Sequence, residues 1–142
     1  MLLFWATYVG NMMSRSEQFE RMYMNIAYEV AQLSRCNRKK VGAIIVKDGN
    51  ILSFGYNGTP SGFCNECEEN DVTKDEVIHA EMNAILKAGK DAQGATMYVT
   101  MSPCIQCAKI IKQSGLECVV FDELYRDTQA LQKLKINYRK IN

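Results

Sequence analysis

The chain has 142 residues, 47% of them apolar, and no segment enriched in Pro, Ser or Gly. This length and composition fit one compact domain and leave no room for a second. The net charge of +1 gives no overall field that would attract a long polyanion such as RNA or DNA. We expect the single domain to span residues 14–142.

The first ten residues are mostly apolar and carry no basic flank. This run is shorter than the roughly 20 residues needed to span a bilayer. It also lacks the charged start and the small-residue cleavage site of a secretory signal. We expect residues 1–13 to form a loose N-terminal extension, unless translation starts at Met12 or Met13.

The first predicted elements follow from apolar periodicity. Ser14, three residues before Glu17, predicts a capped helix that ends near Arg35. Two β-branched runs, 41–46 and 51–54, are separated by an Asp-Gly-Asn turn, which predicts a β-hairpin.

The rest of the chain begins with a long segment, 55–75, whose Gly, Pro, acidic and Cys residues predict an irregular loop that carries function or metal. Helices are predicted over 78–87, 105–113 and 127–134, and strands over 97–101, 118–121 and 136–141. The order α-β-β-α-β-α-β-α-β predicts a three-layer α-β-α sandwich, an α/β fold with a five-stranded mixed sheet and helices on both faces.

The chain has six cysteines, four of them in two Cys-x-x-Cys pairs, Cys64/Cys67 and Cys104/Cys107. In a chain without a secretory signal, such pairs favour metal binding over disulfides. We therefore expect a cytoplasmic protein in a reducing compartment.

Three residues fit a catalytic zinc (Zn²⁺) site, which needs three protein ligands and one open position for water. These residues are His79, Cys104 and Cys107. Pro103 suits the first turn of a helix, which places the two cysteines on one face, and the positive helix end favours their thiolate forms.

Glu81 lies two residues after His79, and at the opening turn of a helix both side chains can reach the same cleft. A carboxylate beside a zinc-activated water can move protons to a leaving amine. His-x-Glu followed by Pro-Cys-x-x-Cys is the signature of zinc-dependent nucleobase deaminases. The alternative is one zinc site formed by all four of these cysteines. The 36 residues between Cys67 and Cys104 exceed the usual separation of about 15 to 20 residues in such sites.

Further motifs carry a closer resemblance. Residues 55–62 read Gly-Tyr-Asn-Gly-Thr-Pro-Ser-Gly, residues 79–85 read His-Ala-Glu-Met-Asn-Ala-Ile, and Met-Tyr-Val-Thr at 97–100 leads to Pro-Cys-x-x-Cys-Ala-Lys at 103–109. From about residue 27 to residue 126, the chain resembles the deoxycytidylate (dCMP) deaminases of bacteria and phages. The resemblance implies a cytidine-deaminase-like fold and hydrolysis of dCMP to dUMP and ammonia, which supplies thymidylate synthesis.

The resemblance also implies a set of substrate contacts. Asn57 is expected to contact the deoxyribose, and Arg38 to help bind the 5′-phosphate. Tyr125 and Arg126 match a pair with the same task. Charge-assisted donors are what a monophosphate requires, although a solvated surface arginine is the alternative for each.

Members of this family are typically homohexamers that dCTP activates and dTTP inhibits. The resemblance implies an effector site at Tyr56, Asn57, Gly58 and Gly62, with magnesium (Mg²⁺) accompanying the triphosphate. We expect neither nucleic acid nor membrane among the partners.

A second, structural zinc is a further possibility, because some relatives hold one beside the substrate cleft. Its ligands here would be Cys36, Cys64 and Cys67, with an acid such as Glu68, Glu69 or Asp71 as the fourth. The alternative is three free thiols.

Three other functions remain open at this point. A tRNA adenosine deaminase would share the zinc signature, but it needs a stronger basic excess to bind a folded polyanion. A DNA-editing cytidine deaminase would want stacking aromatics and basic loops around its cleft. A zinc-stabilised binding module would keep the fold and show no turnover.

Overall fold

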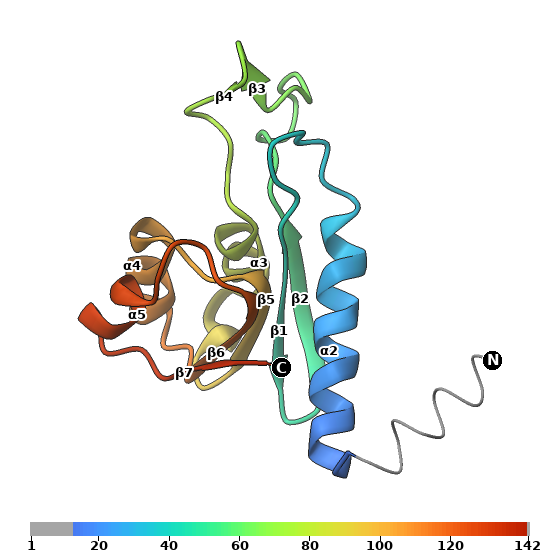
Figure 1. Ribbon diagram of the computed structural model, residues 1–142, viewed down its shortest axis with the longest axis vertical. Helices are drawn as coiled ribbons and strands as arrows, with labels where there is room; N and C mark the ends of the chain where they lie inside the picture. The colour runs from blue at the N-terminus through green and yellow to red at the C-terminus, as the bar shows by residue number, and fades with distance from the viewer. Residues whose placement is uncertain (1–12, 142) are drawn as a thin grey trace, which may run out of the picture.

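The computed structural model describes residues 13–141. The expected extension at residues 1–13 lies outside this range except for Met13. A central sheet separates one long helix from three shorter ones (Figure 1). The helices are α2 (Arg15–Ala31), α3 (Ala80–Ala88), α4 (Ile105–Ser114) and α5 (Gln129–Lys133), with a 3-10 helix η1 (Gly89–Ala92). No helix in this range is long and apolar enough to cross a membrane.

The main sheet has the strand order β2-β1-β5-β6-β7. Its strands are β1 (Gly42–Lys47), β2 (Asn50–Tyr56), β5 (Thr96–Met101), β6 (Cys118–Glu123) and β7 (Tyr138–Lys140). Strand β1 is antiparallel to β2 and β5, whereas β5, β6 and β7 run parallel. The predicted five-stranded mixed sheet and α-β-α layers are therefore confirmed.

The segment expected to be irregular contains one small hairpin, β3 (Glu68–Glu69) and β4 (Val72–Thr73), which extends away from the main sheet (Figure 1). Strands of two residues are too short to show an alternating pattern, so apolar periodicity cannot reveal them.

The sheet buries a different set of side chains on each face. One face packs Ile44, Val46, Tyr98 and Val120 against α2. The opposite face packs a larger set, which includes Ile45, Met97, Val99, Val119 and Phe121, against α3, α4 and α5, and Ala84 and Ile111 are among the buried residues of these helices. The starts of α3 and α4 are thereby fixed on the same side of the sheet.

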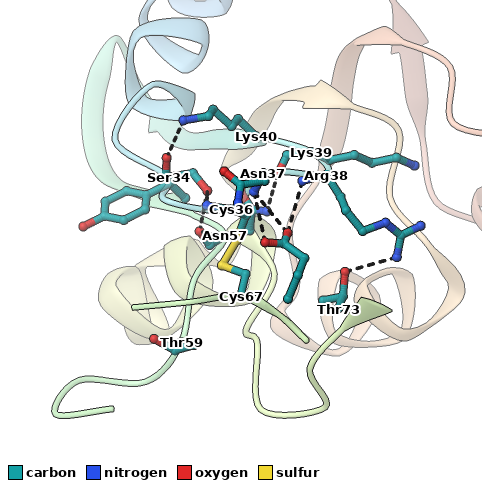
Figure 2. The surroundings of a disulfide bond; sticks show 12 residues. Ser34, Cys36, Asn37, Arg38, Lys39, Lys40, Asn57, Thr59, Cys67 and Thr73 are labelled. Carbon is teal, nitrogen blue, oxygen red and sulfur yellow. Dashed lines mark hydrogen bonds between the residues drawn. A yellow bond between two sulfur atoms is a disulfide. The ribbon is translucent and has the colours of Figure 1, made fainter. Parts of the chain in front are cut away.

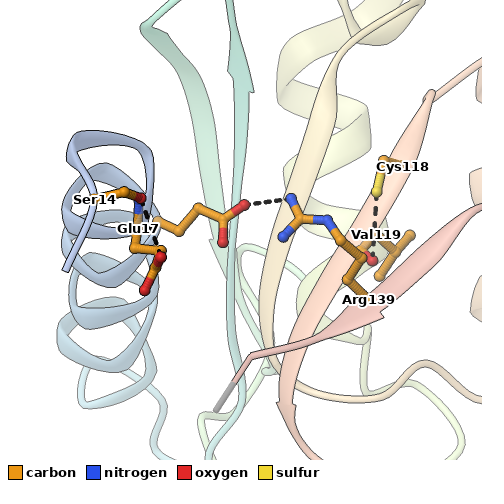
Figure 3. A network of polar contacts seen from close by, with 6 residues as sticks. Ser14, Glu17, Cys118, Val119 and Arg139 are labelled. Atoms are coloured by element: carbon orange, nitrogen blue, oxygen red, sulfur yellow. Dashed lines mark hydrogen bonds and ion pairs between the residues drawn. The ribbon is translucent and has the colours of Figure 1, made fainter. Parts of the chain in front are cut away.

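Helix α2 begins as expected, with the Glu17 amide donating to Ser14 Oγ at 3.2 Å (Figure 3). It ends at Ala31, earlier than the predicted Arg35. The reason is Ser34, which is buried and donates its hydroxyl to the Asn57 carbonyl at 2.8 Å, so the chain turns toward the sheet. An ion pair between Arg139 and Glu20 joins edge strand β7 to the helix (Figure 3).

Close packing of α3 on β2 depends on Gly55. A Cβ at this position would lie 2.4 Å from the Ala80 carbonyl oxygen and 2.5 Å from the Ala84 nitrogen. Because the helix begins at Ala80, this contact sets the height of its first turn above the sheet. Glycine at residue 55 therefore helps to place the residues that open α3.

Candidate active site

The first turns of α3 and α4 bring together the three predicted zinc ligands. His79 is the N-cap residue of α3, Cys104 is the N-cap residue of α4, and Cys107 lies in the first turn of α4. Their ligand atoms all lie within 4.8 Å of one another. His79 Nδ1 is 3.2 Å from Cys107 Sγ and 3.6 Å from Cys104 Sγ.

The electrostatics of this cluster favour one thiolate. A hydrogen bond from the Cys107 thiol, and then one from His79, lowers the pKa of Cys104 to about 3, against the opposing effect of burial. The pKa of Cys107 is raised because its thiol is hydrogen-bonded to Cys104 and is buried. The hydrogen bond to Cys104 raises the pKa of His79.

One nitrogen and two sulfur donors on helix N-termini, close enough to share one ion, are a donor set that suits zinc. Metal binding would replace the protons that these groups now share. His79 is exposed whereas Cys107 is buried, so solvent can reach the cluster from the His79 side.

Glu81 lies in the first turn of α3, two residues after His79, and is 5% exposed. Burial raises the pKa of its carboxyl from 4.5 to about 7, with the charge of His79 acting in the opposite direction. A carboxyl group with this pKa can accept and return a proton near neutral pH. Placement of His79 and Glu81 at the opening of the helix agrees with the geometry expected from the sequence.

A cavity of about 200 Å³ opens beside the cluster. It is lined by residues from the start of α3, the loops before β1 and after β6, and the β3–β4 hairpin, among them His79, Glu81, Cys104, Arg38, Lys39, Asn57, Thr73 and Tyr125. The structure thus brings three of the four predicted substrate residues to one cavity. The fourth, Arg126, does not line it, and its guanidinium carbon lies 5.0 Å from the centre of the Tyr125 ring.

Asn57 has a structural task in addition to its place in the cavity. Its Oδ1 accepts from the Val41 amide at 2.9 Å, and its Nδ2 donates to the Lys39 carbonyl at 2.8 Å. The side chain therefore holds the loop before β1. Each amide atom keeps capacity for one more bond, so contact with a sugar is still compatible with this arrangement.

Arg38 is held from two sides. Its backbone amide donates to Glu68 Oε2 at 3.1 Å, and its guanidinium donates to Thr73 Oγ1 at 3.3 Å (Figure 2). The Asn37 amide also donates to the Glu68 carboxylate, at 3.1 and 3.2 Å. The β3–β4 hairpin and the loop that carries Arg38 are fastened together by these bonds.

The cysteines beside this loop differ from the expectation. Cys36 and Cys67 form a disulfide (Figure 2), and Cys64 is a free, exposed thiol. The expected group of three cysteines is therefore not assembled, and the preference of the Cys-x-x-Cys pairs for metal over disulfides is wrong for Cys67. Cys64 lies instead in an exposed segment, where its carbonyl accepts from Thr59 Oγ1 at 2.8 Å.

Glu68 is the acid that lies near the two disulfide sulfurs. Ligand atoms of Cys36, Cys67 and Glu68 lie within 4.8 Å of one another. Among the three acids considered from the sequence, the structure therefore brings Glu68 to this group.

The residues expected at an effector site lie apart from the cavity, with the exception of Asn57. Tyr56, Gly58 and Gly62 do not line it. The Tyr56 carbonyl accepts from Asn83 Nδ2 at 2.9 Å, Gly58 pairs with Ile78 through two backbone hydrogen bonds, and Gly62 has a φ of +87°.

Sequence reasoning assigned no individual role to three polar residues that line the cavity: Lys39, Thr73 and Ser102. Ser102 is 3% exposed, and its Oγ accepts from the Tyr125 amide at 2.7 Å. The position of a small polar residue directly before Pro103 was the one signal available for Ser102. Lys39 and Thr73 carry no such signal, because their partners are distant in sequence.

Comparison with known proteins agrees with this geometry. A family model described as the cytidine and deoxycytidylate deaminase zinc-binding region matches residues 17–123. The chain belongs to this family. Deoxycytidylate deaminase of Enterobacteria phage T4 is 37% identical over 72% of this chain and 76% of its own length. That of Mycobacterium phage D29 is 38% identical over 77% of this chain and 97% of its own length.

A solved structure is similar over nearly the whole chain. The crystal structure of dCMP deaminase from the cyanophage S-TIM5, in complex with dCMP and dUMP, has a TM-score of 0.82 at 42% identity, covering 90% of this chain and 98% of that one. The α/β fold of this deaminase family member is therefore that of dCMP deaminases. Both zinc-signature motifs lie inside the span matched by the family model, whereas Tyr125 and Arg126 lie beyond it.

Proposed function

We propose that this deaminase hydrolyses dCMP to dUMP and ammonia, with residues 14–142 as its single catalytic domain. One observation carries the proposal: the buried carboxyl group of Glu81 faces the same cavity as the His79 and Cys104 ligand atoms and the cationic residue Arg38. A cavity with a proton carrier, a metal site and a cation suits an anionic nucleotide with a hydrolysable amine.

His79, Cys104 and Cys107 would hold the zinc, which supplies the Lewis acidity that makes water a nucleophile near neutral pH. Glu81 takes up the protons of the attacking water and passes one to ring N3 and one to the exocyclic nitrogen of the cytosine, so that a C4–O bond forms, the C4–N bond breaks and ammonia leaves. A pKa of about 7 lets the same carboxyl group serve in both steps. Burial of Glu81 keeps bulk water from exchanging the proton during transfer.

The substrate end of the cavity supports a monophosphate. Arg38 presents a guanidinium whose Nη1 contacts only the neutral Thr73 hydroxyl among the described residues. Tyr125 lines the same region, and Arg126 stands behind its ring. We propose that Arg38, Tyr125 and Arg126 bind the 5′-phosphate and Asn57 the deoxyribose.

The test is ammonia release by the zinc-loaded protein with dCMP, deoxycytidine and adenosine-containing tRNA as separate substrates. We expect turnover of dCMP, with kcat/KM well above that for deoxycytidine. Turnover of the tRNA alone would point to the adenosine deaminase, and no turnover of any substrate at full zinc content would point to a binding module.

Regulation and assembly are a second part of the proposal. We propose a homohexamer that dCTP with Mg²⁺ activates and dTTP inhibits, with Tyr56, Asn57, Gly58 and Gly62 at the effector site. Exposed apolar side chains at edge strand β2, Ile51 and Phe54, support association of copies. Light scattering measures the number of copies in the assembly. The rate of dCMP turnover, measured with dCTP and with dTTP, tests the proposed activation and inhibition.

A second zinc remains a prediction that depends on the redox state. Cys36, Cys67 and Glu68 can offer three ligand atoms only when the disulfide is reduced, because a disulfide provides no thiolate. Zinc content measured before and after reduction tests it: a rise from one to two ions per chain is expected. A cytoplasmic location, which also remains a prediction, would favour the reduced form.

A further inference from the structure

We propose that Lys39 is a specificity-determining residue, which recognises the charge of the 5′-phosphate and so makes the site select a nucleoside monophosphate over the nucleoside. This inference rests on the proposed function, because it concerns the substrate of that same cavity. Neither the zinc signature nor the resemblance assigned a role to Lys39.

The placement of Lys39 is the first argument. Its side chain lines the cavity that also contains His79 and Glu81. The ammonium nitrogen lies 3.4 Å from the centre of the Tyr125 ring, which is cation–π contact. The backbone is held as well, since the Lys39 carbonyl accepts from Asn57 Nδ2 at 2.8 Å.

The backbone that carries the ring beneath the ammonium is itself held. The Tyr125 amide donates to the buried Ser102 hydroxyl at 2.7 Å. Lys39 is an exposed residue, and a free lysine side chain loses considerable rotamer freedom when it binds an anion. Contact with a positioned ring reduces that loss, because the ammonium is already held where the cavity needs it.

The charges around the cavity point the same way. Neither Arg38 nor Lys39 forms an ion pair with a carboxylate within residues 13–141. Glu68, which also lines the cavity, accepts instead from the backbone amides of Asn37 and Arg38. Two cations therefore face the cavity without a neutralising partner among the described residues, which suits a ligand of about −1.5 to −2 charge, as a phosphate monoester carries at pH 7.

The next residue provides a matched control. Lys40 has the same side chain, but its ammonium donates to the Ser34 carbonyl at 2.9 Å and it does not line the cavity. Figure 2 shows the two lysines extending in opposite directions from the same loop. If Lys39 recognises the phosphate, only its replacement should affect selectivity for dCMP. If positive charge acts in a general way, replacement of Lys40 should have the same effect.

The experiment measures kcat/KM for dCMP and for deoxycytidine with the zinc-loaded protein. Lys39→Met should lower the ratio of the two values by about tenfold or more, chiefly through KM for dCMP, because one charge-assisted contact is lost. Lys39→Arg should restore most of the ratio. Lys40→Met should leave the ratio at the wild-type value.

Two outcomes would overturn the inference: an unchanged ratio in Lys39→Met, or an equal loss in Lys40→Met. In both cases wild-type selectivity for dCMP would leave the proposed function standing. Equal wild-type use of deoxycytidine and dCMP would instead remove the proposed function. Tyr125→Leu supplies a second measurement. If the Tyr125 ring positions the Lys39 ammonium, Lys39→Met should have a smaller effect in the Tyr125→Leu background than in wild type. Fully additive effects of the two substitutions would contradict this positioning.

Discussion

The predicted metal-ligand cluster and the rim of the cavity, which we define as Arg38, Lys39, Asn57 and Tyr125, are built in different ways. His79, Glu81, Cys104 and Cys107 lie on the first turns of two helices that pack on the central sheet. The rim residues lie on loops, and hydrogen bonds, a disulfide and cation–π contacts hold them in place. The proposed zinc ligands and proton carrier thus have a rigid apolar support, whereas the residues proposed to contact the substrate depend on polar bonds between loops.

The largest expected effect is on the cluster. Glu81→Gln keeps the shape of the side chain but cannot carry the proton, so kcat for dCMP should fall by about 10²- to 10⁴-fold. Zinc content, measured by atomic absorption, should remain at one ion per chain, because Glu81 is outside the ligand set. Glu117→Gln, an exposed residue far from the cavity, is the control. Loss of zinc from Glu81→Gln would mean that the carboxylate supports the metal instead.

The second prediction breaks the support of the cluster. Gly55→Ala would place a Cβ 2.4 Å from the Ala80 carbonyl oxygen, so α3 must shift away from β2. We expect a loss of about 1–3 kcal/mol in the free energy of unfolding, measured in urea, together with reduced turnover. Gly58→Ala is the stability control, since nothing lies within 4 Å of its Cβ position. Equal stability of the two variants would show that α3 is not held rigidly.

The third prediction uses the raised pKa of Glu81 in zinc-free protein. Folding holds this proton up to a pKa of about 7, while the unfolded chain releases it near 4.5. The folded state therefore binds more protons between these values, and stability falls as pH rises through that window. Relative to wild type, Glu81→Gln should gain up to about 3 kcal/mol between pH 4 and pH 8. Urea unfolding at both pH values measures this gain, and a constant difference would contradict the burial argument.

How far the sequence could predict the molecule follows the same division. The grouping of His79, Glu81 and the two cysteines of α4 could be predicted because the spacings are local: each motif lies within one helical turn. The sheet and its helices were predicted because apolar periodicity marks buried faces.

The rim could be predicted only in part, because its geometry comes from pairs that are distant in sequence. Cys36 and Cys67 are separated by 31 residues, and Lys39 meets Tyr125 only after the sheet has formed. The resemblance to dCMP deaminases predicted Arg38 and Tyr125 as substrate contacts, but no feature of the sequence around Lys39 distinguishes it from Lys40. The contact between Glu68 and the Asn37 amide likewise depends on how the β3–β4 hairpin folds back.

The smallest expected effect is at that contact. Glu68→Gln replaces a charged acceptor of the Asn37 and Arg38 amides with a neutral one, which should weaken their hold by about 1 kcal/mol. Because Arg38 then samples more positions, KM for dCMP should rise a few-fold while kcat changes little. Glu69→Gln, an exposed neighbour, is the matched control. The rise in KM should be larger when the Cys36–Cys67 disulfide of the zinc-loaded protein is reduced without added free zinc, because the disulfide and the Glu68 hydrogen bonds join the same two segments. An effect of Glu68→Gln that does not depend on reduction would show that the two connections act independently.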